Sequence, residues 1–470
     1  MLKNIYHLYL LIFLVFVYLI QFPVNAQEQN KNPKPENYVV LISIDGMKPE
    51  YYTKADQYKL KIPNLRAFCR EGSFAEGAET VYPSLTYPSH TTLVTGNRPA
   101  THGIISNQTW RGLETNKTEE WYWYANAIKS PTLWTEARKA GLKTGAVAWP
   151  ATAGAEIDYL VPEIWEGSFN TSFKTSMAKS TVGLPELILK SLPDPAPTLL
   201  NDLVRVQAAK TIISKYKPNL LLVHFVEVDY QQHRKGIFSS EAKAKLEETD
   251  EFIGQIINAT KEAGIFEQTS FFVVSDHGFA PVEKQFRPAV LLAKEGFITL
   301  GKDGQVMDWQ ALPFGQGGST AIMMKNPNDK ITEFKIIEML EKFANKPNSP
   351  INRVIKRAEL DKLGSSTEAS CFLEAAPGYE INSELAGSLT ENSKDYLATH
   401  GGLPTRSEMY ASFIASGHGI KKGLREPFTK NIHVAPTIAA ILGFSLPQAE
   451  GHPIRQILTV EVPKIKAAAK

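Results

Sequence analysis

Three segments of this chain share a pattern that few folds accommodate: a run of mostly apolar residues that ends in an aspartate. The runs occupy residues 38–44, 219–228 and 269–275, and the aspartates are Asp45, Asp229 and Asp276. Nearly continuous apolar runs are typical of central parallel strands that are covered on both faces. In doubly wound sheets, ligands bind at the carboxyl edge of such strands. The pattern therefore predicts an α/β fold with a mostly parallel central sheet, helices on both faces, and three carboxylates at the ligand-binding edge.

Histidines accompany these aspartates. His277 follows the third aspartate directly, and His233 stands four residues after the second, a spacing that brings two side chains together on a helical turn. His400 lies in T-H-G-G, where glycines permit a close approach to a metal or substrate. His224 stands inside a strand and is interpreted as a core histidine. Capping of the next turn explains one aspartate such as Asp45, but three such endings, two with a nearby histidine, indicate metal ligands, because zinc accepts both carboxylate and imidazole.

The segment Y-P-S-L-T-Y-P-S-H-T-T-L-V-T-G, residues 82–96, supplies a candidate nucleophile. Thr86 stands between two prolines, ahead of a helix that we expect to start near Ser89, because Pro88 biases Tyr87 away from the α region. A hydroxyl at that place faces unpaired N–H groups and the positive end of the helix dipole, which favour phosphate. A threonine hydroxyl needs a metal to become a strong nucleophile near neutral pH. The alternative is a helix cap with no chemical role.

These motifs resemble those of the nucleotide pyrophosphatase/phosphodiesterase family, within the alkaline phosphatase superfamily. The resemblance runs from Y-V-V-L-I-S-I-D-G to about residue 455 and includes T-Y-P-S-H, E-V-D-Y-Q-Q-H, S-D-H-G-F and T-H-G-G. It implies an alkaline-phosphatase-like core with two Zn²⁺ ions. One ion would be held by Asp229, His233 and His400, and the other by Asp45, Asp276, His277 and the Thr86 oxygen. The family resemblance also implies a phospho-threonine intermediate on Thr86, with Asn107 binding a phosphoryl oxygen.

The same resemblance implies a substrate pocket beside the nucleophile. Tyr87 stands where family members place an aromatic residue, and Trp165 lies near where they place a second, so that the two rings would sandwich a nucleobase. The chain reads W-P-A-T at residues 149–152, where the family often reads W-P-G-S. The implied substrates are nucleotides or related small phosphodiesters, which would release a nucleoside 5′-monophosphate. Ordinary loop packing is the alternative for Trp165, and a glycosylation sequon, N-Q-T, is the alternative for Asn107.

The α/β alternation loosens between residues 296 and 385, where hairpin signals and one isolated helix predict an inserted α+β cap subdomain. The glycine-rich stretch at 314–320 lacks the order of a phosphate-binding P-loop and is interpreted as a plain loop. The catalytic core is then expected to comprise residues 27–295 and 386–460, followed by a tail at 461–470.

Residues 1–26 have the pattern of a cleavable signal peptide. Lys3 precedes an apolar run from Leu8 to Phe22, and Val24-Asn25-Ala26 is a small-x-small cleavage pattern. An uncleaved membrane anchor is the alternative, because the run is close to the length of a membrane span. Membrane association is expected only in that case, and otherwise the protein is expected to be secreted or periplasmic.

Composition narrows the kinds of protein and partner that fit this sequence. Two cysteines, Cys69 and Cys371, make no disulfide framework, which favours a bacterial exported enzyme over an animal ectoprotein. The formal net charge of +2 gives no reason to expect a nucleic-acid polymer as partner. The oligomeric state stays open.

Several alternatives fit parts of the pattern. A phosphomonoesterase of the same superfamily would add cations near the nucleophile; the Thr86 motif has none, although Arg98 and Arg111 are nearby. A phosphonate hydrolase uses similar metals and a threonine. A sulfatase would need a C/S-x-P-x-R motif, which the nucleophile segment lacks. A non-enzymatic zinc-containing binding protein fits less well, because structural zinc sites are usually closed and rich in cysteine.

Overall fold

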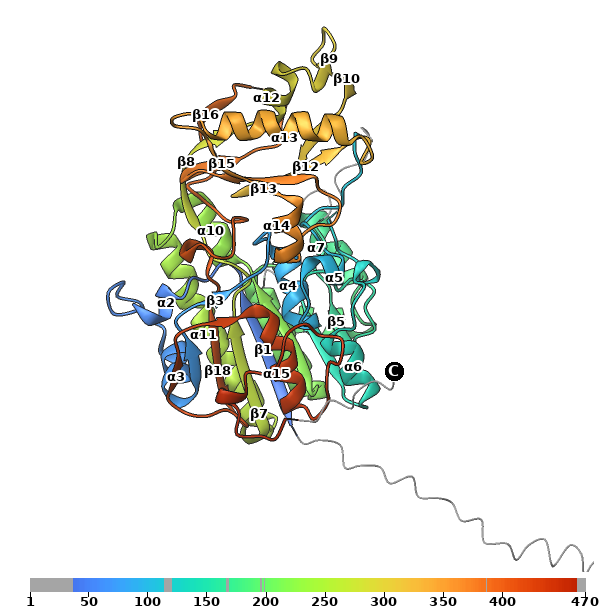
Figure 1. Ribbon diagram of the computed structural model, residues 1–470. Helices are drawn as coiled ribbons and strands as arrows, with labels where there is room; N and C mark the ends of the chain where they lie inside the picture. Colours follow the sequence, from blue (N-terminus) through green and yellow to red (C-terminus); the bar gives the residue numbers. More distant parts are fainter. Residues whose placement is uncertain are drawn as a thin grey trace, which may run out of the picture. The chain divides into compact units, whose positions relative to one another are not determined.

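The three apolar segments form the middle of an eight-stranded sheet, in the order β19-β2-β18-β7-β1-β6-β4-β5 (Figure 1). β1 (Tyr38–Ile44) pairs in parallel with β6 (Leu220–Phe225) on one side and with β7 (Thr269–Val274) on the other. Two further parallel strands, β4 (Thr144–Val147) and β5 (Tyr159–Val161), extend the sheet beyond β6. The prediction of an α/β fold with a mostly parallel central sheet is confirmed.

The other edge of the sheet is mixed. β18 (Phe413–Gly417) runs antiparallel to β7, and β2 (Ser73–Ala75) and β19 (Leu424–Glu426) follow it. The late return of the chain to this sheet brings residues after 398 next to strands from its first half. That return places the T-H-G-G loop near the carboxyl ends of β1 and β7.

The computed structural model describes residues 37–113, 121–165, 169–194, 197, 199–385 and 387–462. The predicted signal peptide at 1–26 lies outside these residues, as does most of the predicted tail at 461–470. Of the helices within the described ranges, none has both the length and the hydrophobicity that a bilayer crossing requires.

Alternate side chains of β1 enter two different cores, because successive residues of a strand point to opposite faces. Val40, Ile42 and Ile44 share one core with α3 (Pro63–Glu71), α9 (Asp202–Tyr216) and α11 (Ser240–Glu262). Val39 and Leu41 share the other with α4 (Thr86–Thr95), α6 (Leu133–Lys139) and α15 (Val434–Ile441). The strand is therefore covered on both faces, which explains its continuous apolar sequence.

A second, antiparallel sheet occupies the region predicted as a cap. Its order is β11 (Ala311–Phe314), β12 (Ser319–Met324), β14 (Cys371–Ala375) and β13 (Ile351–Lys356). α13 (Lys330–Ala344) contributes Ile336 and Leu340 to the core of this sheet and runs alongside it in Figure 1. The cap boundaries at residues 296 and 385 stay predictions.

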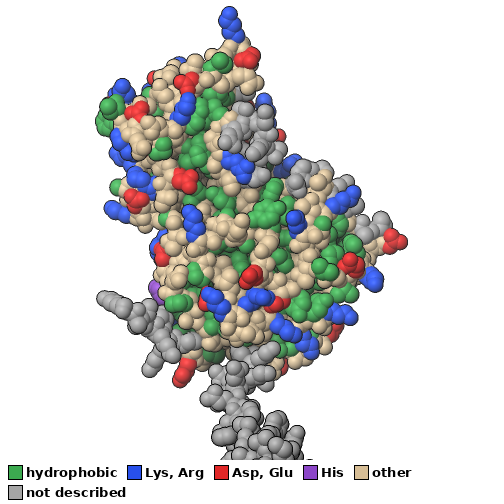
Figure 2. Space-filling view, turned by 90° about the vertical axis from the view of Figure 1, so that its right-hand side faces the viewer, with side chains coloured by type: hydrophobic (Ala, Val, Ile, Leu, Met, Phe, Trp, Pro, Cys, Tyr) green, Lys and Arg blue, Asp and Glu red, His purple; other side chains and the backbone are tan. Residues whose placement is uncertain are grey.

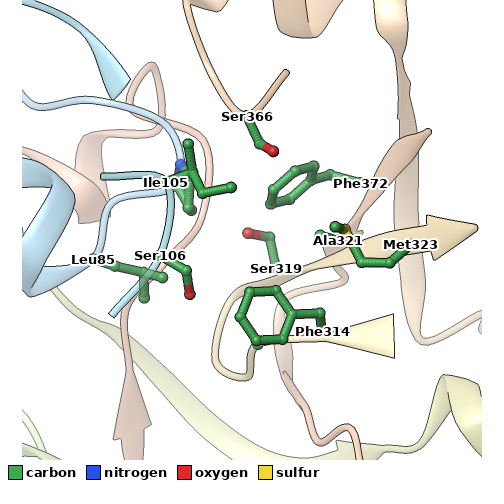
Figure 3. Close-up of a pocket in the computed structure, with 11 residues that line it drawn as sticks. Leu85, Ile105, Ser106, Phe314, Ser319, Ala321, Met323, Ser366 and Phe372 are labelled. Atoms are coloured by element: carbon green, nitrogen blue, oxygen red, sulfur yellow. The ribbon is translucent and has the colours of Figure 1, made fainter. Parts of the chain in front are cut away.

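The loop before α4 packs against this second sheet. The Tyr82 ring lies 5.2 Å from that of Phe372, and Leu85 and Phe314 line a cavity of about 10 Å³ between the loop and the sheet (Figure 3). Such a space holds no more than a single water. The second sheet therefore supports the segment that leads into Thr86.

The remaining described elements are helices and the strands of three smaller sheets. They are α2 (Glu50–Thr53), β3 (Ala78–Glu79), α5 (Pro99–His102), α7 (Phe169–Ala178), α8 (Leu184–Ser191), α10 (Glu227–Lys235), β8 (Ala280–Phe286), α12 (Pro288–Lys294), β9 (Ile298–Leu300), β10 (Val306–Trp309), α14 (Arg357–Leu363), β15 (Gly378–Ile381), β16 (Thr390–Asn392), β17 (Ala398–Thr399) and β20 (Thr429–Lys430), together with five short 3₁₀ turns. In the three smaller sheets, β8 pairs with β15, β16 and β17, β9 with β10, and β3 with β20. On the face seen in Figure 2, cationic and anionic side chains are interspersed rather than gathered into regions of one sign.

Candidate functional site

The predicted carboxylates meet at the carboxyl edge of three adjacent strands. Asp45 directly follows β1, Asp276 stands two residues after the end of β7, and Asp229 lies in the first turn of α10, just after β6. Gly46 permits this convergence. Its N–H donates to Asp276 Oδ1 at 3.0 Å, its φ is +65°, and a Cβ at this position would lie 2.4 Å from the Phe279 ring. Only glycine fits that close approach.

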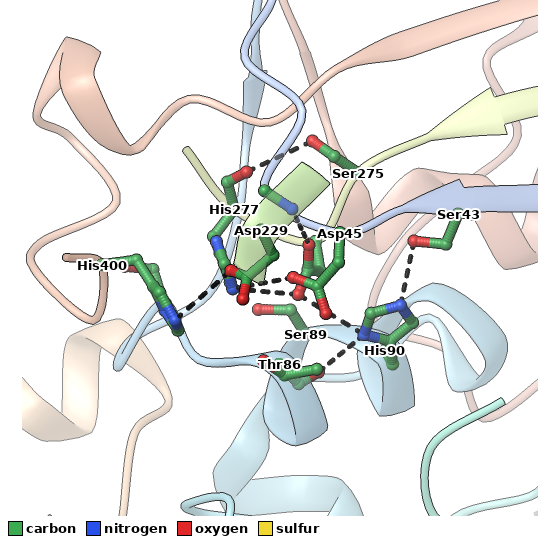
Figure 4. A network of polar contacts seen from close by, with 12 residues as sticks. Ser43, Asp45, Thr86, Ser89, His90, Asp229, Ser275, His277 and His400 are labelled. Atoms are coloured by element: carbon green, nitrogen blue, oxygen red, sulfur yellow. Dashed lines mark hydrogen bonds and ion pairs between the residues drawn. The ribbon is translucent and has the colours of Figure 1, made fainter. Parts of the chain in front are cut away.

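Two groups of potential ligands form around these carboxylates (Figure 4). The first group is Asp229, His233 and His400, and the second is Asp45, Asp276 and His277. Within each group the ligand atoms all lie within 4.8 Å of one another. The rings of His277 and His400 stack with centroids 3.5 Å apart, so the two groups adjoin. The structure thus brings together the three aspartates and three histidines predicted as metal ligands, divided as the sequence resemblance implied.

The three histidines are oriented as metal ligands require. In each ring, Nδ1 faces a backbone carbonyl: Ala398 for His233, Ser84 for His400 and Gly278 for His277, at 2.9, 3.0 and 3.2 Å. When Nδ1–H donates to these carbonyls, the Nε2 lone pair is directed into the group. This is the arrangement that fixes the tautomer of a metal-bound histidine.

Several buried polar atoms of the two groups lack hydrogen-bond partners among the described residues. They are Asp45 Oδ1, Asp229 Oδ1, Asp276 Oδ2 and His277 Nε2. A buried polar atom without a partner is costly, and a cation coordinated by these atoms would remove that cost. The donor set therefore fits a divalent metal.

Electrostatics point the same way. Burial, followed by the charges of Asp276 and Asp229, raises the pKa of Asp45 well above its usual value. Burial likewise raises the pKa of Asp229 and lowers the pKa of His400 well below its usual value. Burial opposes ionisation of Asp276, but His277 and His90 hold its pKa below the usual range. Crowded, buried carboxylates of this kind are stabilised by a cation.

Thr86 is the first residue of α4, and the expectation of a helix start near Ser89 is wrong. Pro88 does not delay the helix, because the N–H groups of the first turn have no intrahelical acceptor and a missing one costs nothing. At this helix start, Tyr87 N donates to Asn107 Oδ1 at 2.9 Å and Pro88 has no N–H, so neither of these two residues offers a free N–H to an anion.

The Asn107 side chain is held in one orientation by that bond from Tyr87. Its carbonyl oxygen is engaged, which leaves the amide NH₂ as the donor for a ligand. Thr86 and Asn107 line one cavity of about 270 Å³, whose wall also includes Asp229, His233 and His400. The candidate nucleophile, the candidate oxyanion donor and the first ligand group therefore face a common space.

His224 is buried in β6, as predicted, but it also contacts the site. Its Nε2 lies 3.0 Å from Asp45 Oδ2, and its Nδ1 lies 3.1 Å from the Ala148 carbonyl oxygen and 3.3 Å from Arg205 Nη1. When Nε2 carries the proton, Nε2–H donates to Asp45 and Nδ1 accepts from Arg205. Sequence reasoning missed this supporting role, since nothing in a strand sequence shows which neighbouring carboxylate a buried histidine faces.

The two aromatic residues predicted to bind a nucleobase lie apart from this cavity. Tyr87 is fully buried and packs against Trp121 with ring centroids 5.4 Å apart. Trp165 lines a separate cavity of about 490 Å³, which shares Asp229 and Tyr230 with the first. Trp121 does line the first cavity, together with Tyr230 and Tyr396. The aromatic run W-Y-W-Y at 121–124 was the available signal for it.

Comparison with known proteins identifies similar sequences and folds. The family model described as type I phosphodiesterase / nucleotide pyrophosphatase matches residues 39–402. Ectonucleotide pyrophosphatase/phosphodiesterase family member 7 of Rattus norvegicus is 25% identical over 444 residues, which cover 92% of this chain and 87% of the relative. Family member 1 of Homo sapiens is 23% identical over 421 residues, 86% of this chain but 40% of that longer protein. A bis(5'-adenosyl)-triphosphatase of Xenopus laevis is 22% identical over 418 residues, 87% of this chain and 78% of the relative.

Solved structures show a similar fold. Human ectonucleotide pyrophosphatase/phosphodiesterase 5 superposes with a TM-score of 0.65 at 19% identity, over 90% of this chain and 100% of that chain. An inactive variant of the murine protein, in complex with AMP, gives a TM-score of 0.64 at the same identity and coverage.

Proposed function

The chain belongs to the type I phosphodiesterase / nucleotide pyrophosphatase family, and we propose that it hydrolyses nucleotides or related small phosphodiesters through a covalent phospho-threonine intermediate. Members of this family are hydrolases of phosphodiester and pyrophosphate bonds. The observation that carries the proposal is the shared cavity: the Thr86 hydroxyl, the Asn107 amide and the first ligand group open onto the same space. A nucleotide substrate is supported by the names of the relatives, one of them an adenosyl triphosphatase.

The proposal includes two Zn²⁺ ions, one in each ligand group. Asp229, His233 and His400 would hold the first, and Asp45, Asp276, His277 and the Thr86 oxygen the second. Mixed carboxylate and imidazole donors suit zinc, whereas magnesium prefers oxygen donors alone. When bound, such a pair of ions supplies Lewis acidity that favours the ionised threonine and stabilises charge on the attacking and leaving oxygens.

Thr86 acts as the nucleophile in the first displacement. Its hydroxyl loses its proton to solvent and the oxygen bonds to phosphorus in line with the departing oxygen, while the P–O bond to the leaving group breaks and its electron pair stays on the leaving oxygen. The threonine then carries the phosphoryl group with the nucleoside still attached. In the second displacement a water attacks phosphorus from the side the leaving group has vacated, and the Thr86 oxygen departs and regains a proton.

Asn107 stabilises both displacements. Its carbonyl oxygen is occupied by Tyr87 N, so its NH₂ group can donate to a non-bridging phosphoryl oxygen as negative charge develops there. A donor fixed before the reaction loses no energy to reorganisation. His90 supports the nucleophile from within the helix: its Nδ1 lies 2.8 Å from the Thr86 carbonyl oxygen, and its Nε2 2.9 Å from Ser43 Oγ on β1.

Activity on two chromogenic esters tests the proposal. The substrates are the nitrophenyl diester of thymidine 5′-monophosphate and nitrophenyl phosphate, each with and without a chelator. We expect wild-type hydrolysis of the diester, loss with chelator, and loss in Thr86→Ala. Thr91→Ala is a matched control, because Thr91 Oγ1 bonds only to the Tyr87 carbonyl oxygen of its own helix, at 2.8 Å.

Each contrary outcome has a distinct meaning. Full diesterase activity in Thr86→Ala would rule out the covalent mechanism. Preference for nitrophenyl phosphate would indicate a phosphomonoesterase, and hydrolysis of a phosphonate alone would indicate a phosphonate hydrolase. No activity on any ester in zinc-loaded protein would favour a zinc-containing binding protein.

Export is part of the proposal and rests on the residues of the N-terminal segment, 1–26. The intact mass of the protein recovered outside the cytoplasm tests this. A mass that corresponds to a chain beginning at Gln27 would support cleavage of a signal peptide. A mass that retains residues 1–26 would support the anchor instead.

A further inference from the structure

The cavity that contains Thr86 has further lining residues besides Asn107 and the first ligand group. They are Tyr230, Arg234, Gln316, Glu380 and Tyr396, and this set is called the far end. Asp45, Asp276 and His277 do not line the cavity. A substrate whose phosphorus lies at Thr86 therefore occupies a space that the far end also lines.

Arg234, the cation of the far end, lies on α10, the helix that carries two of the proposed ligands. On α10, Asp229 and His233 stand at i and i+4, and Tyr230 and Arg234 follow each of them by one residue. The guanidinium carbon of Arg234 lies 4.7 Å from the centre of the Tyr230 ring, a cation–π contact that restricts the arginine side chain. One helix thus fixes the positions of Tyr230 and Arg234 relative to the two proposed ligands.

Arg234 is an uncommitted cation. Its side chain forms no ion pair and no hydrogen bond with any residue that the structure describes. The acid that shares the far end, Glu380, is 92% buried, with its Oε1 bonded to Ser393 Oγ at 2.9 Å, and burial raises its pKa. Arg234 is exposed and lines the cavity, and a guanidinium without an acidic partner there is suited to an anion, since its planar donors match phosphate oxygens.

We infer that Arg234 binds the leaving group, and that it selects phosphoanhydride substrates, whose leaving group is a phosphate or pyrophosphate, over esters of neutral alcohols. This inference rests on the proposed function, because it requires in-line attack by Thr86 with the leaving group on the side of the first ligand group. The P–O bond breaks with its electron pair on the leaving oxygen. A pyrophosphate thus gains one negative charge on departure, in addition to those it already carries, and Arg234 follows His233 of the first ligand group by one residue on α10.

Kinetics with two substrates of one nucleoside test the assignment in the zinc-loaded full-length protein. ATP, which would release pyrophosphate, is compared with the nitrophenyl ester of AMP, whose leaving group has a single delocalised charge. We expect Arg234→Gln to lower kcat/KM for ATP by about tenfold, the effect of losing one partly exposed charged contact, and to leave the ester nearly unchanged. Arg234→Lys should fall between, because lysine keeps the charge and loses the planar donors.

Lys235→Gln is the matched control, since it removes the same charge from the next residue of α10, which does not line the cavity. It should leave both substrates unaffected. Equal losses for ATP and the ester in Arg234→Gln, or no loss for either, would overturn the leaving-group assignment. Absence of wild-type activity on both substrates would instead overturn the proposed function, and the assignment with it.

Discussion

His224 is predicted to hold Asp45 in the orientation that zinc ligation requires. Its ring is fully buried, with Nε2 at 3.0 Å from Asp45 Oδ2, so Oδ1 is left free to point into the second ligand group. Arg205 Nη1, at 3.3 Å from Nδ1, fixes the opposite side of the ring. Replacing His224 by leucine removes the donor while preserving most of the side-chain volume.

The magnitude follows from the single bond that is lost. A hydrogen bond to a charged group contributes about 1.5–3 kcal/mol, and 1.4 kcal/mol corresponds to a factor of ten in affinity. Loss of a hydrogen-bonding neighbour of a metal ligand typically costs 10–100-fold in metal affinity, which agrees with that range. We therefore expect His224→Leu to weaken zinc binding at one of two sites by about 10–100-fold. His224→Gln, whose amide nitrogen can occupy the place of Nε2, should lose less than about tenfold.

Zinc competition with a chromogenic chelator measures both affinities directly, and thermal melting of the same samples reports whether each variant is folded. His102→Leu is the control: His102 is also fully buried, but its Nε2 lies 3.1 Å from Thr92 Oγ1 and it contacts neither ligand group. If His224→Leu folded and bound two zinc ions as tightly as His102→Leu and wild type, the reasoning would be refuted. If His224→Leu did not fold, His224→Gln would decide. Zinc affinity equal to that of His102→Leu would support the reasoning, and a hundredfold loss of affinity would contradict it.

Three further predictions concern other residues of the site and its support. Asn107→Ala should lower kcat for the nucleotide diester by about 10²–10³-fold, measured against Gln108→Ala, because it removes a donor to the developing oxyanion. Asp45→Asn should raise the melting temperature of zinc-free protein, since it removes one of three crowded carboxylates. It should lower the melting temperature of zinc-loaded protein. A fall in both would contradict the claim that crowding of the carboxylates destabilises the zinc-free site. Burial raises the pKa of Glu374 from 4.5 to about 7, so between these pH values the folded state holds a proton that the unfolded chain has lost. The stability that is present below about pH 4.5 is therefore lost as the pH rises to about 7. Urea unfolding should therefore show wild type losing roughly 3 kcal/mol more than Glu374→Gln between about pH 4.5 and pH 8.

The central sheet and the ligand groups were predictable because their signals are local. A buried parallel strand is apolar along its whole length, and its last residue necessarily reaches the carboxyl edge of the sheet. Adjacent strands bring Asp45 and Asp276 together whatever the loops do. The i, i+4 spacing of Asp229 and His233 likewise survives folding, since a helix begins at Glu227.

The expected helix start near Ser89 was wrong for a local reason, because Pro88 falls in the first turn of α4, where its missing N–H is harmless. Features that depend on contacts distant in sequence were not predictable. The packing of Trp121 over Tyr87 depends on where a loop folds back, which no periodicity encodes. The orientation of His224 toward Asp45 depends on the register of two strands 179 positions apart in sequence.

The stereochemical course at phosphorus tests the central claim, a covalent intermediate on Thr86, most directly. A nucleoside phosphorothioate diester of known configuration is hydrolysed in isotopically labelled water, and the configuration of the chiral product is determined. Each in-line displacement inverts phosphorus, so two successive displacements through Thr86 predict net retention. Net inversion would mean that water attacks the substrate in a single step, and would contradict the account.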